Sequence, residues 1–172
     1  MKFMKTQQDL KLNQMKKVLI ALDYDPSAKK VAELGYSISQ AMNADVILLH
    51  VLADNAYYSI LPVSPIMEFG GFENYDFSQM ANLNGLKKAA EYYLEKIAGH
   101  LGDQSIQIVI EEGDLADSIL NTAKHFHANL IVMGSHSRRW LEQVLIGSST
   151  EKVLRQTTIP LLVVPIKEHI SK

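Results

Sequence analysis

Two hydrophobic patterns alternate along the chain. Four short runs are apolar without interruption, which is typical of parallel strands that helices cover on both faces. A fifth run alternates, so that Ile106, Ile108 and Ile110 share one face, and it predicts a strand nearer the sheet edge. In chain order the runs are KVLIALD (17–23), DVILLHV (45–51), SIQIVIEE (105–112), NLIVMG (129–134) and PLLVVP (160–165).

Three stripes of apolar residues at helical spacing lie between these runs. Residues that favour helix starts accompany them: Asp25 followed by Pro26, Asp114, and Ser148, which fits a capping box with Glu151 before a last, short helix. The stripes are Val31, Leu34, Ile38 and Ala41; Leu86, Ala90, Tyr93, Leu94 and Ile97; and Ile119, Leu120, Ala123 and Phe126.

Strands and helices therefore alternate throughout the chain. This order predicts an α/β fold, a doubly wound parallel sheet with right-handed crossovers and helices on both faces. Ligands of such sheets bind beyond the carboxyl ends of the strands, where the winding reverses. With five strands, the reversal separates the first strand from the third or the fourth. The first strand ends at Asp23 and the fourth at Gly134, so we expect the ligand near these residues.

Length and patterning predict a single domain over residues 16–167. Residues 1–15 lack the apolar core of a signal peptide and are expected to form a flexible tail or leader, and residues 168–172 a second tail. Residues 53–82 make a connection of about thirty residues, far longer than usual. This insertion is rich in aromatic residues, so we expect it to pack as a surface flap or a dimer contact rather than a lid: Tyr57, Tyr58, Phe69, Phe72, Tyr75 and Phe77.

Composition excludes several classes of protein. The chain is 47% apolar and 21% charged with a net charge of −2, which argues against a general nucleic-acid or membrane-surface binder. No apolar stretch is long enough to cross a membrane. The absence of cysteine removes thiolate metal sites and disulfides and fits a cytoplasmic location. No histidine or carboxylate cluster has metal-ligand spacing, so no metal site is predicted.

The connection GSHSRRWLEQVLIGSST (134–150) begins at the expected ligand edge. Gly134 and Gly147 would let the backbone approach a ligand closely or adopt a positive φ. Ser148, Ser149 and Thr150 then offer N–H groups and hydroxyls at the start of a helix. Helix N-termini bind anions, phosphate above all, so this loop is a candidate phosphate cradle. The alternative is that Gly147 only admits the turn and Ser148 only caps the helix.

Set between LIVM and PLLVVP, this loop resembles that of the universal stress protein family. Nucleotide-binding members of the family carry a Gly-x2-Gly-x9-Gly-Ser/Thr signature, and this chain has Gly134, Ser137, Gly147 and Ser148 at those positions. The similarity extends to VLIALDYDPSA, VILLHV and EEGDLADSILNTAKHFHANLIVMGSHS, and covers roughly residues 16–166. It implies a five-stranded Rossmann-like sheet in the order 3-2-1-4-5.

The resemblance also implies ATP, with Mg²⁺ or Mn²⁺, as the ligand. Asp23 would then lie beside the adenosine, with Ala21 lining its floor and Val51 against the adenine. Met133 and Gly134 would lie against the ribose and phosphates. The phosphates would be held by the rest of the signature: Ser137, Gly147, Ser148, Ser149 and Thr150.

Ser137 stands where the family's nucleotide binders have their second glycine. Its side chain would either crowd the phosphates or serve them through its N–H and hydroxyl. Two functions follow: an ATP-binding stress-response homodimer that acts as a nucleotide-dependent sensor, or a universal stress protein without nucleotide that acts through protein contacts.

Other activities fit less well. No pair of a nucleophile and a general base can be identified in the sequence, so no catalytic residue is predicted. The chain is therefore expected not to be an enzyme, with only slow ATP hydrolysis left open. Asp23 and Asp25 could mimic the acidic pair of a phosphoryl-accepting receiver domain. The third strand, however, ends in Glu111 and Glu112 rather than in a single aspartate.

The last strand is apolar on both faces and falls at the sheet edge. An exposed apolar edge is a template for pairing with another chain. This predicts a homodimer through Leu161, Leu162, Val163 and Val164, and the resemblance implies the same. An unidentified regulatory protein would be a further partner; neither nucleic acid nor membrane is expected.

Overall fold

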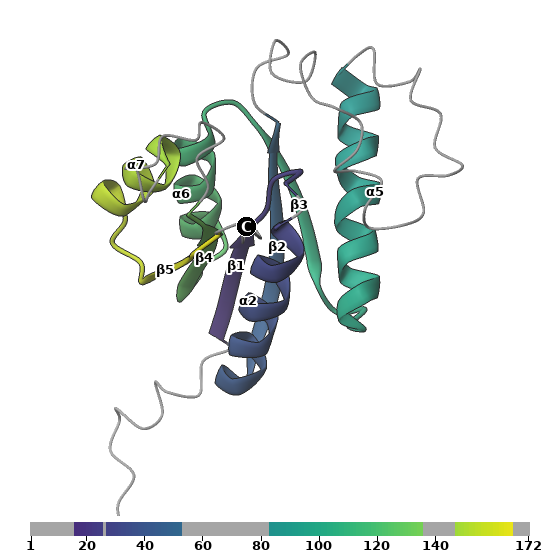
Figure 1. Cartoon of the computed structure of the whole chain (residues 1–172), viewed down its shortest axis with the longest axis horizontal. Helices are drawn as coiled ribbons and strands as arrows, with labels where there is room; N and C mark the ends of the chain where they lie inside the picture. Colours follow the sequence, from purple (N-terminus) through teal and green to yellow (C-terminus); the bar gives the residue numbers. More distant parts are fainter. Residues whose placement is uncertain (1–15, 26, 53–82, 136–146, 167–172) are drawn as a thin grey trace, which may run out of the picture.

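The computed structural model describes residues 16–25, 27–52, 83–135 and 147–166, which build a parallel sheet with helices on both sides (Figure 1). The strand order is β3-β2-β1-β4-β5, so the winding reverses between β1 and β4. The predicted fold class and strand order are thereby confirmed. The strands are β1 (Lys16–Ala21), β2 (Ala44–Leu52), β3 (Gln107–Glu112), β4 (Leu130–Gly134) and β5 (Leu161–Val164).

Four helices of the described chain cover the two faces of this sheet (Figure 1). Helices α2 (Ala28–Met42) and α5 (Leu83–Leu101) enclose one core, and α6 (Leu115–His125) and α7 (Ser148–Gln156) enclose the other. The central strand β1 serves both cores, and its Val18, Leu19 and Ile20 are completely buried. The alternating run became β3, an edge strand, as its pattern predicts.

Helix α2 buries only part of the predicted stripe, since Val31 is buried and Ile38 is half-buried. Leu34 is 40% exposed and Ala41 is also exposed, whereas Gly35 is buried against the sheet. A Cβ at position 35 would lie 2.7 Å from Cδ1 of Ile20, so only glycine lets this helix approach so closely. The predicted stripe was wrong at Leu34 and Ala41, because small residues, which carry little hydrophobicity, form the contact beside the buried Val31: Ala28, Ala32, Gly35 and Ser39.

The other two stripes are confirmed, and the helix starts agree in part. Asp114 caps α6 by accepting a hydrogen bond from the Asp117 N–H at 3.0 Å. The capping box of Ser148 and Glu151 was wrong, because Gly147 is the N-cap of α7 and Glu151 binds Arg155 instead. The predicted tails and the insertion 53–82 lie outside the described residues.

Candidate functional site

The carboxyl ends of β1 and β4 lie side by side, since Ala21 is paired with Met133 in the parallel register. Both side chains belong to the core on the α6 and α7 side of the sheet, and so does Val51 at the end of β2. Side chains alternate along a strand, so this shared face follows from the register. The structure therefore brings together three of the residues predicted to contact the nucleoside.

Asp23 follows β1 by two residues and is half-buried. Its Oδ1 accepts a hydrogen bond from the Asp25 N–H at 3.2 Å, and Oδ1 of Asp25 accepts one from the Ser27 N–H at 2.9 Å. These two bonds build a turn that leads into α2. Asp23 thus takes part in a local turn and also lies at the ligand edge beyond β1.

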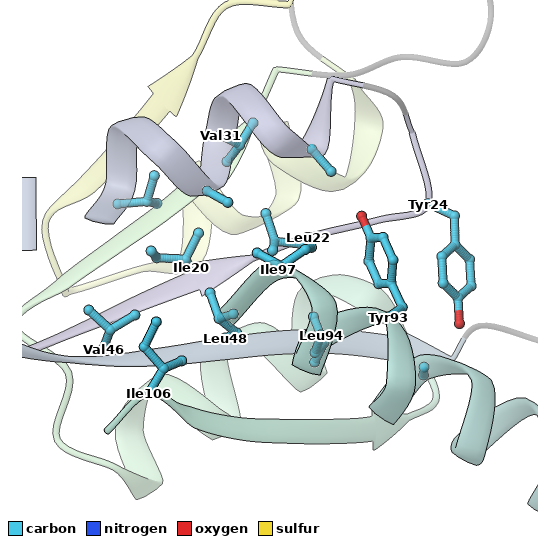
Figure 2. Packing of buried hydrophobic residues seen from close by; sticks show 14 of the residues in the cluster. Ile20, Leu22, Tyr24, Val31, Val46, Leu48, Tyr93, Leu94, Ile97 and Ile106 are labelled. Atoms are coloured by element: carbon cyan, nitrogen blue, oxygen red, sulfur yellow. The ribbon is translucent and has the colours of Figure 1, made fainter. Parts of the chain in front are cut away.

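Three buried rings back this turn on the opposite face of the sheet. His50 donates from Nδ1 to the Leu22 carbonyl at 2.8 Å, and the Tyr93 hydroxyl donates to the Asp23 carbonyl at 2.6 Å. Tyr24 lies against both, with ring centroids 4.2 Å from His50 and 4.9 Å from Tyr93. Figure 2 shows Tyr93 extending from α5 toward the chain that follows β1, with Tyr24 beside it.

His50 is a buried, hydrogen-bonded core residue, and no pattern in the sequence pointed to Tyr24 or Tyr93 near the site. Burial is the main reason why the pKa of Tyr93 lies well above its ordinary value, and the charge of Asp23 adds to it. The hydroxyl is therefore a permanent donor in the physiological pH range.

On the other side of the winding reversal, backbone bonds close the base of the connection from β4 to α7. The Gly147 N–H donates to the Ser135 carbonyl at 3.1 Å, and the Ser135 N–H donates to the Val164 carbonyl at 2.9 Å. The buried Thr150 hydroxyl donates to the Gly134 carbonyl at 3.1 Å. Its proton is committed to the fold, so Thr150 has its N–H left to offer an anion.

Gly134 does not adopt the positive φ that was one of the two expectations for it. A Cβ there would lie 2.4 Å from Cδ1 of Ile166 and 3.5 Å from Cγ2 of Val31. The space beside its Cα is therefore filled by the protein itself. Gly147 is also extended, with φ −68° and ψ 154°, so neither glycine is needed for a left-handed conformation.

Helix α7 begins without a side-chain cap. The first intrahelical bond runs from the Glu151 N–H to the Gly147 carbonyl at 2.9 Å. Within the described ranges, no acceptor lies on the N–H groups of Ser148, Ser149 and Thr150. These groups start next to the end of β4, because Gly147 is bonded to Ser135. The arrangement is a set of donors with partial positive charge at the ligand edge of the sheet.

Several predicted features are not placed. Ser137 lies outside the described residues, so its effect on the loop stays a prediction. In β5, Leu161, Leu162 and Val163 are half-buried, whereas Val164 is completely buried. β5 is at the sheet edge as predicted.

The part of the chain that the structure describes contains no group of three or more histidines and carboxylates placed to hold a metal ion. None of its helices is long and apolar enough to cross a membrane.

Comparisons with known proteins agree with this architecture. The chain is 28% identical over 156 residues to universal stress protein MJ0577 of Methanocaldococcus jannaschii, an alignment that covers 88% of this chain and 96% of the relative. The solved structure of MJ0577 has a TM-score of 0.66 and covers 89% of this chain and 97% of its own.

Two further structures share the fold at lower identity. A universal stress protein in complex with cAMP is 18% identical, with a TM-score of 0.58 and coverage of 89% of this chain and 98% of that one. The universal stress protein of Archaeoglobus fulgidus in complex with dAMP is 17% identical, with a TM-score of 0.54 and coverage of 87% and 97%.

The model of the universal stress protein family matches residues 15–165, which include every described strand and helix and the whole connection from Gly134 to Thr150. The sheet order and this match agree. The chain belongs to the universal stress protein family.

Proposed function

We propose that this protein is an ATP-binding regulatory homodimer, with the nucleotide held where β1 and β4 part. The observation that carries the proposal is the uncapped N-terminus of α7, whose Ser148, Ser149 and Thr150 N–H groups have no acceptor within the described chain. Such a terminus is a ready anion site. A triphosphate would supply acceptors that the described residues do not.

The adenosine would occupy the adjoining ends of β1, β2 and β4. Ala21, Val51 and Met133 offer an apolar floor on one face of the sheet, and the Asp23 carboxylate lies at its rim. Apolar walls with a few placed polar groups are what a nucleoside site requires. Two proteins of this fold have been solved with cAMP and with dAMP, which is consistent with an adenine nucleotide at this edge.

A divalent ion would enter with the phosphates. Mg²⁺ in nucleotide sites is often held by phosphate oxygens and water with only one or two protein ligands. The donors of α7 suit the phosphate itself, and the ion would neutralise the remaining charge. Binding without catalysis is proposed, so the nucleotide would act as a signal to a partner rather than as a substrate.

The homodimer would form through β5. Its Leu161, Leu162 and Val163 are only half-buried in a single chain, at an edge strand with apolar side chains on both faces. Pairing with a second copy would cover them and continue the sheet. The molar mass of the protein in solution, by light scattering, tests this part separately.

The experiment is a calorimetric titration of the purified protein with Mg²⁺–ATP, ADP, AMP and adenosine, after denaturing a sample and assaying the supernatant for released nucleotide. We expect micromolar affinity that increases with the number of phosphates. Gly147→Ala should abolish the gain in affinity from the phosphates, because it adds a methyl group at the N-cap of α7, next to the N–H groups proposed to hold them. Gly99→Ala is the matched control, since a Cβ there meets nothing within 4 Å.

A protein that releases no nucleotide and binds none of these ligands would overturn the proposal. The function would then be that of a universal stress protein without nucleotide, which acts through protein contacts. Restored binding in Ser137→Gly would assign the loss to the position where the chain departs from the family signature.

A further inference from the structure

The backbone just beyond β1 is held by side chains from two other elements. The Leu22 N–H still joins the sheet through the Leu49 carbonyl at 2.9 Å, but the strand ends at Ala21. Leu22 and Asp23 each keep a carbonyl directed away from the ladder. His50 of β2 bonds the first of these carbonyls and Tyr93 of α5 bonds the second.

These two donors are themselves fixed by packing. His50 is 3% exposed and Tyr93 is completely buried, and the Tyr24 ring packs against both. Figure 2 shows that Tyr24 and Tyr93 lie at the end of the core nearest the turn, beyond Leu22. A buried ring without rotational freedom places its hydroxyl accurately. The Asp23 carbonyl is thus bonded to a rigid donor 70 positions away in the chain.

The bond to this carbonyl has a consequence for the Asp23 carboxylate. Leu22 and Tyr24, on either side of Asp23, both belong to the core on the α2 and α5 side. Because its two neighbours enter that core, we expect the Asp23 side chain to leave the backbone on the other side, where Ala21 and Met133 lie, with its Oδ1 held by the Asp25 N–H at 3.2 Å. The hydrogen bond from Tyr93 holds the Asp23 carbonyl in place, and it thereby restricts the direction in which the Asp23 side chain leaves the backbone.

We propose that Tyr93 is a positioning residue of the nucleotide site: its hydroxyl, through the Asp23 carbonyl, orients the Asp23 carboxylate toward the adenosine. The inference rests on the proposed function and deepens it. Tyr93 itself touches no ligand. It belongs to the opposite core and acts through the backbone that separates the two faces of the sheet.

The test is Tyr93→Phe, which removes one oxygen and keeps the buried ring. Tyr36→Phe is the matched control, because its hydroxyl also donates a hydrogen bond, to Asp103 Oδ2 at 3.2 Å, between α2 and the turn after α5. Each variant loses one tyrosine hydrogen bond, so small decreases in thermal stability are expected in both. We expect only Tyr93→Phe to weaken binding, by about threefold to tenfold.

The ligand series separates positioning from a general loss of structure. Because Asp23 is assigned to the adenosine, Tyr93→Phe should weaken adenosine, AMP and Mg²⁺–ATP by the same factor. Gly147→Ala should instead spare adenosine and abolish the gain from phosphates. Equal affinities of wild type and Tyr93→Phe would overturn the inference and leave the proposed function intact. A weakening of equal size in Tyr36→Phe would also overturn it, and a wild type that binds nothing overturns both.

Discussion

The two chain segments that meet at the ligand edge are built in opposite ways. In the turn after β1, two backbone carbonyls accept hydrogen bonds from the buried side chains of His50 and Tyr93. At the start of α7, the first backbone N–H groups have no partner within the helix, and no side chain of the described residues caps them. A binding site needs both kinds of segment: one that the protein completes, which is rigid, and one that it leaves for the ligand to complete.

Backbone hydrogen bonds next to the N-terminus of α7 hold it in place, although no side chain within the described ranges caps its first N–H groups. Gly147 and Ser135 are joined, and Ser135 continues the ladder to β5 through Val164. The Thr150 hydroxyl ties the first turn of α7 to Gly134. The helix start is therefore held in place without any described residue accepting from its leading N–H groups. This difference between the two segments leads to opposite expectations for mutation.

The largest effect should come from removing a donor in the completed turn. His50→Ala leaves the Leu22 carbonyl without its bond and opens a cavity between Tyr24 and Tyr93. We expect the free energy of unfolding in urea to fall by about 3 kcal/mol. His125→Ala, at an exposed histidine of α6, should change it by less than about 0.5 kcal/mol. A loss below about 1 kcal/mol for His50→Ala would mean that the turn stands without this donor.

The second prediction concerns the uncapped start of α7, where one substitution should raise the stability of the protein and lower its affinity for ATP. Ser148→Asp places a negative charge on the uncapped start of α7, which should stabilise the free protein by about 0.5 kcal/mol. The same charge competes with the phosphates, so affinity for Mg²⁺–ATP should fall about tenfold at low salt. Urea unfolding and calorimetry measure the two effects on one sample.

Ser148→Asn is the matched control, because it has the same size as the aspartate without the charge. It should leave ATP affinity within about twofold of the wild type, since surface changes of this kind have small effects. Undiminished ATP affinity in Ser148→Asp would contradict a phosphate site at α7. Loss of the difference at high salt would support its electrostatic origin.

The fold was predictable because burial on both faces leaves a strong pattern. The uninterrupted apolar runs became the four strands β1, β2, β4 and β5, and the alternating run became the edge strand β3. Local chemistry carried less information. Ser148 and Glu151 have the spacing of a capping box, but Gly147 takes the N-cap position and Arg155 binds Glu151. Spacing alone does not reveal which partner a side chain prefers.

The candidate site was predictable only where strand ends define it. The family resemblance named Ala21, Val51 and Met133, and the parallel sheet places these three on one face. Tyr93 was not predicted as a site residue, because it lies in an ordinary apolar helix stripe and its partner is 70 positions away. Only the packing of α5 against the end of β1 makes its hydroxyl part of the site. Such contacts between distant elements have no local pattern for a single sequence to display.

The smallest effect should come from the cluster of three charged side chains on the surface that joins α7 to α6. Lys152 Nζ lies 3.0 Å from Asp114 Oδ1 and 3.1 Å from Asp117 Oδ1, with all three side chains partly exposed. The Asp117 N–H and then Lys152 hold the pKa of Asp114 below its ordinary value, and the two carboxylates raise the pKa of Lys152. Solvent screens such a pair, so a small contribution is expected.

The sign of its pH dependence follows from these directions. A carboxyl whose folded-state pKa is lowered stabilises the fold above its ordinary pKa, and this stabilisation is lost as the pH falls through the lowered value. Lys152→Met should therefore unfold slightly more easily at neutral pH, and its urea midpoint should converge with the wild type as the pH falls through the lowered pKa of Asp114. Lys88→Met, at an exposed lysine of α5, should run parallel to the wild type throughout. If the urea midpoint of Lys152→Met also ran parallel to that of the wild type, Lys152 would not contribute to holding α7. The start of α7 would then depend on Thr150 and its backbone bonds alone, unlike the turn after β1, which side chains hold.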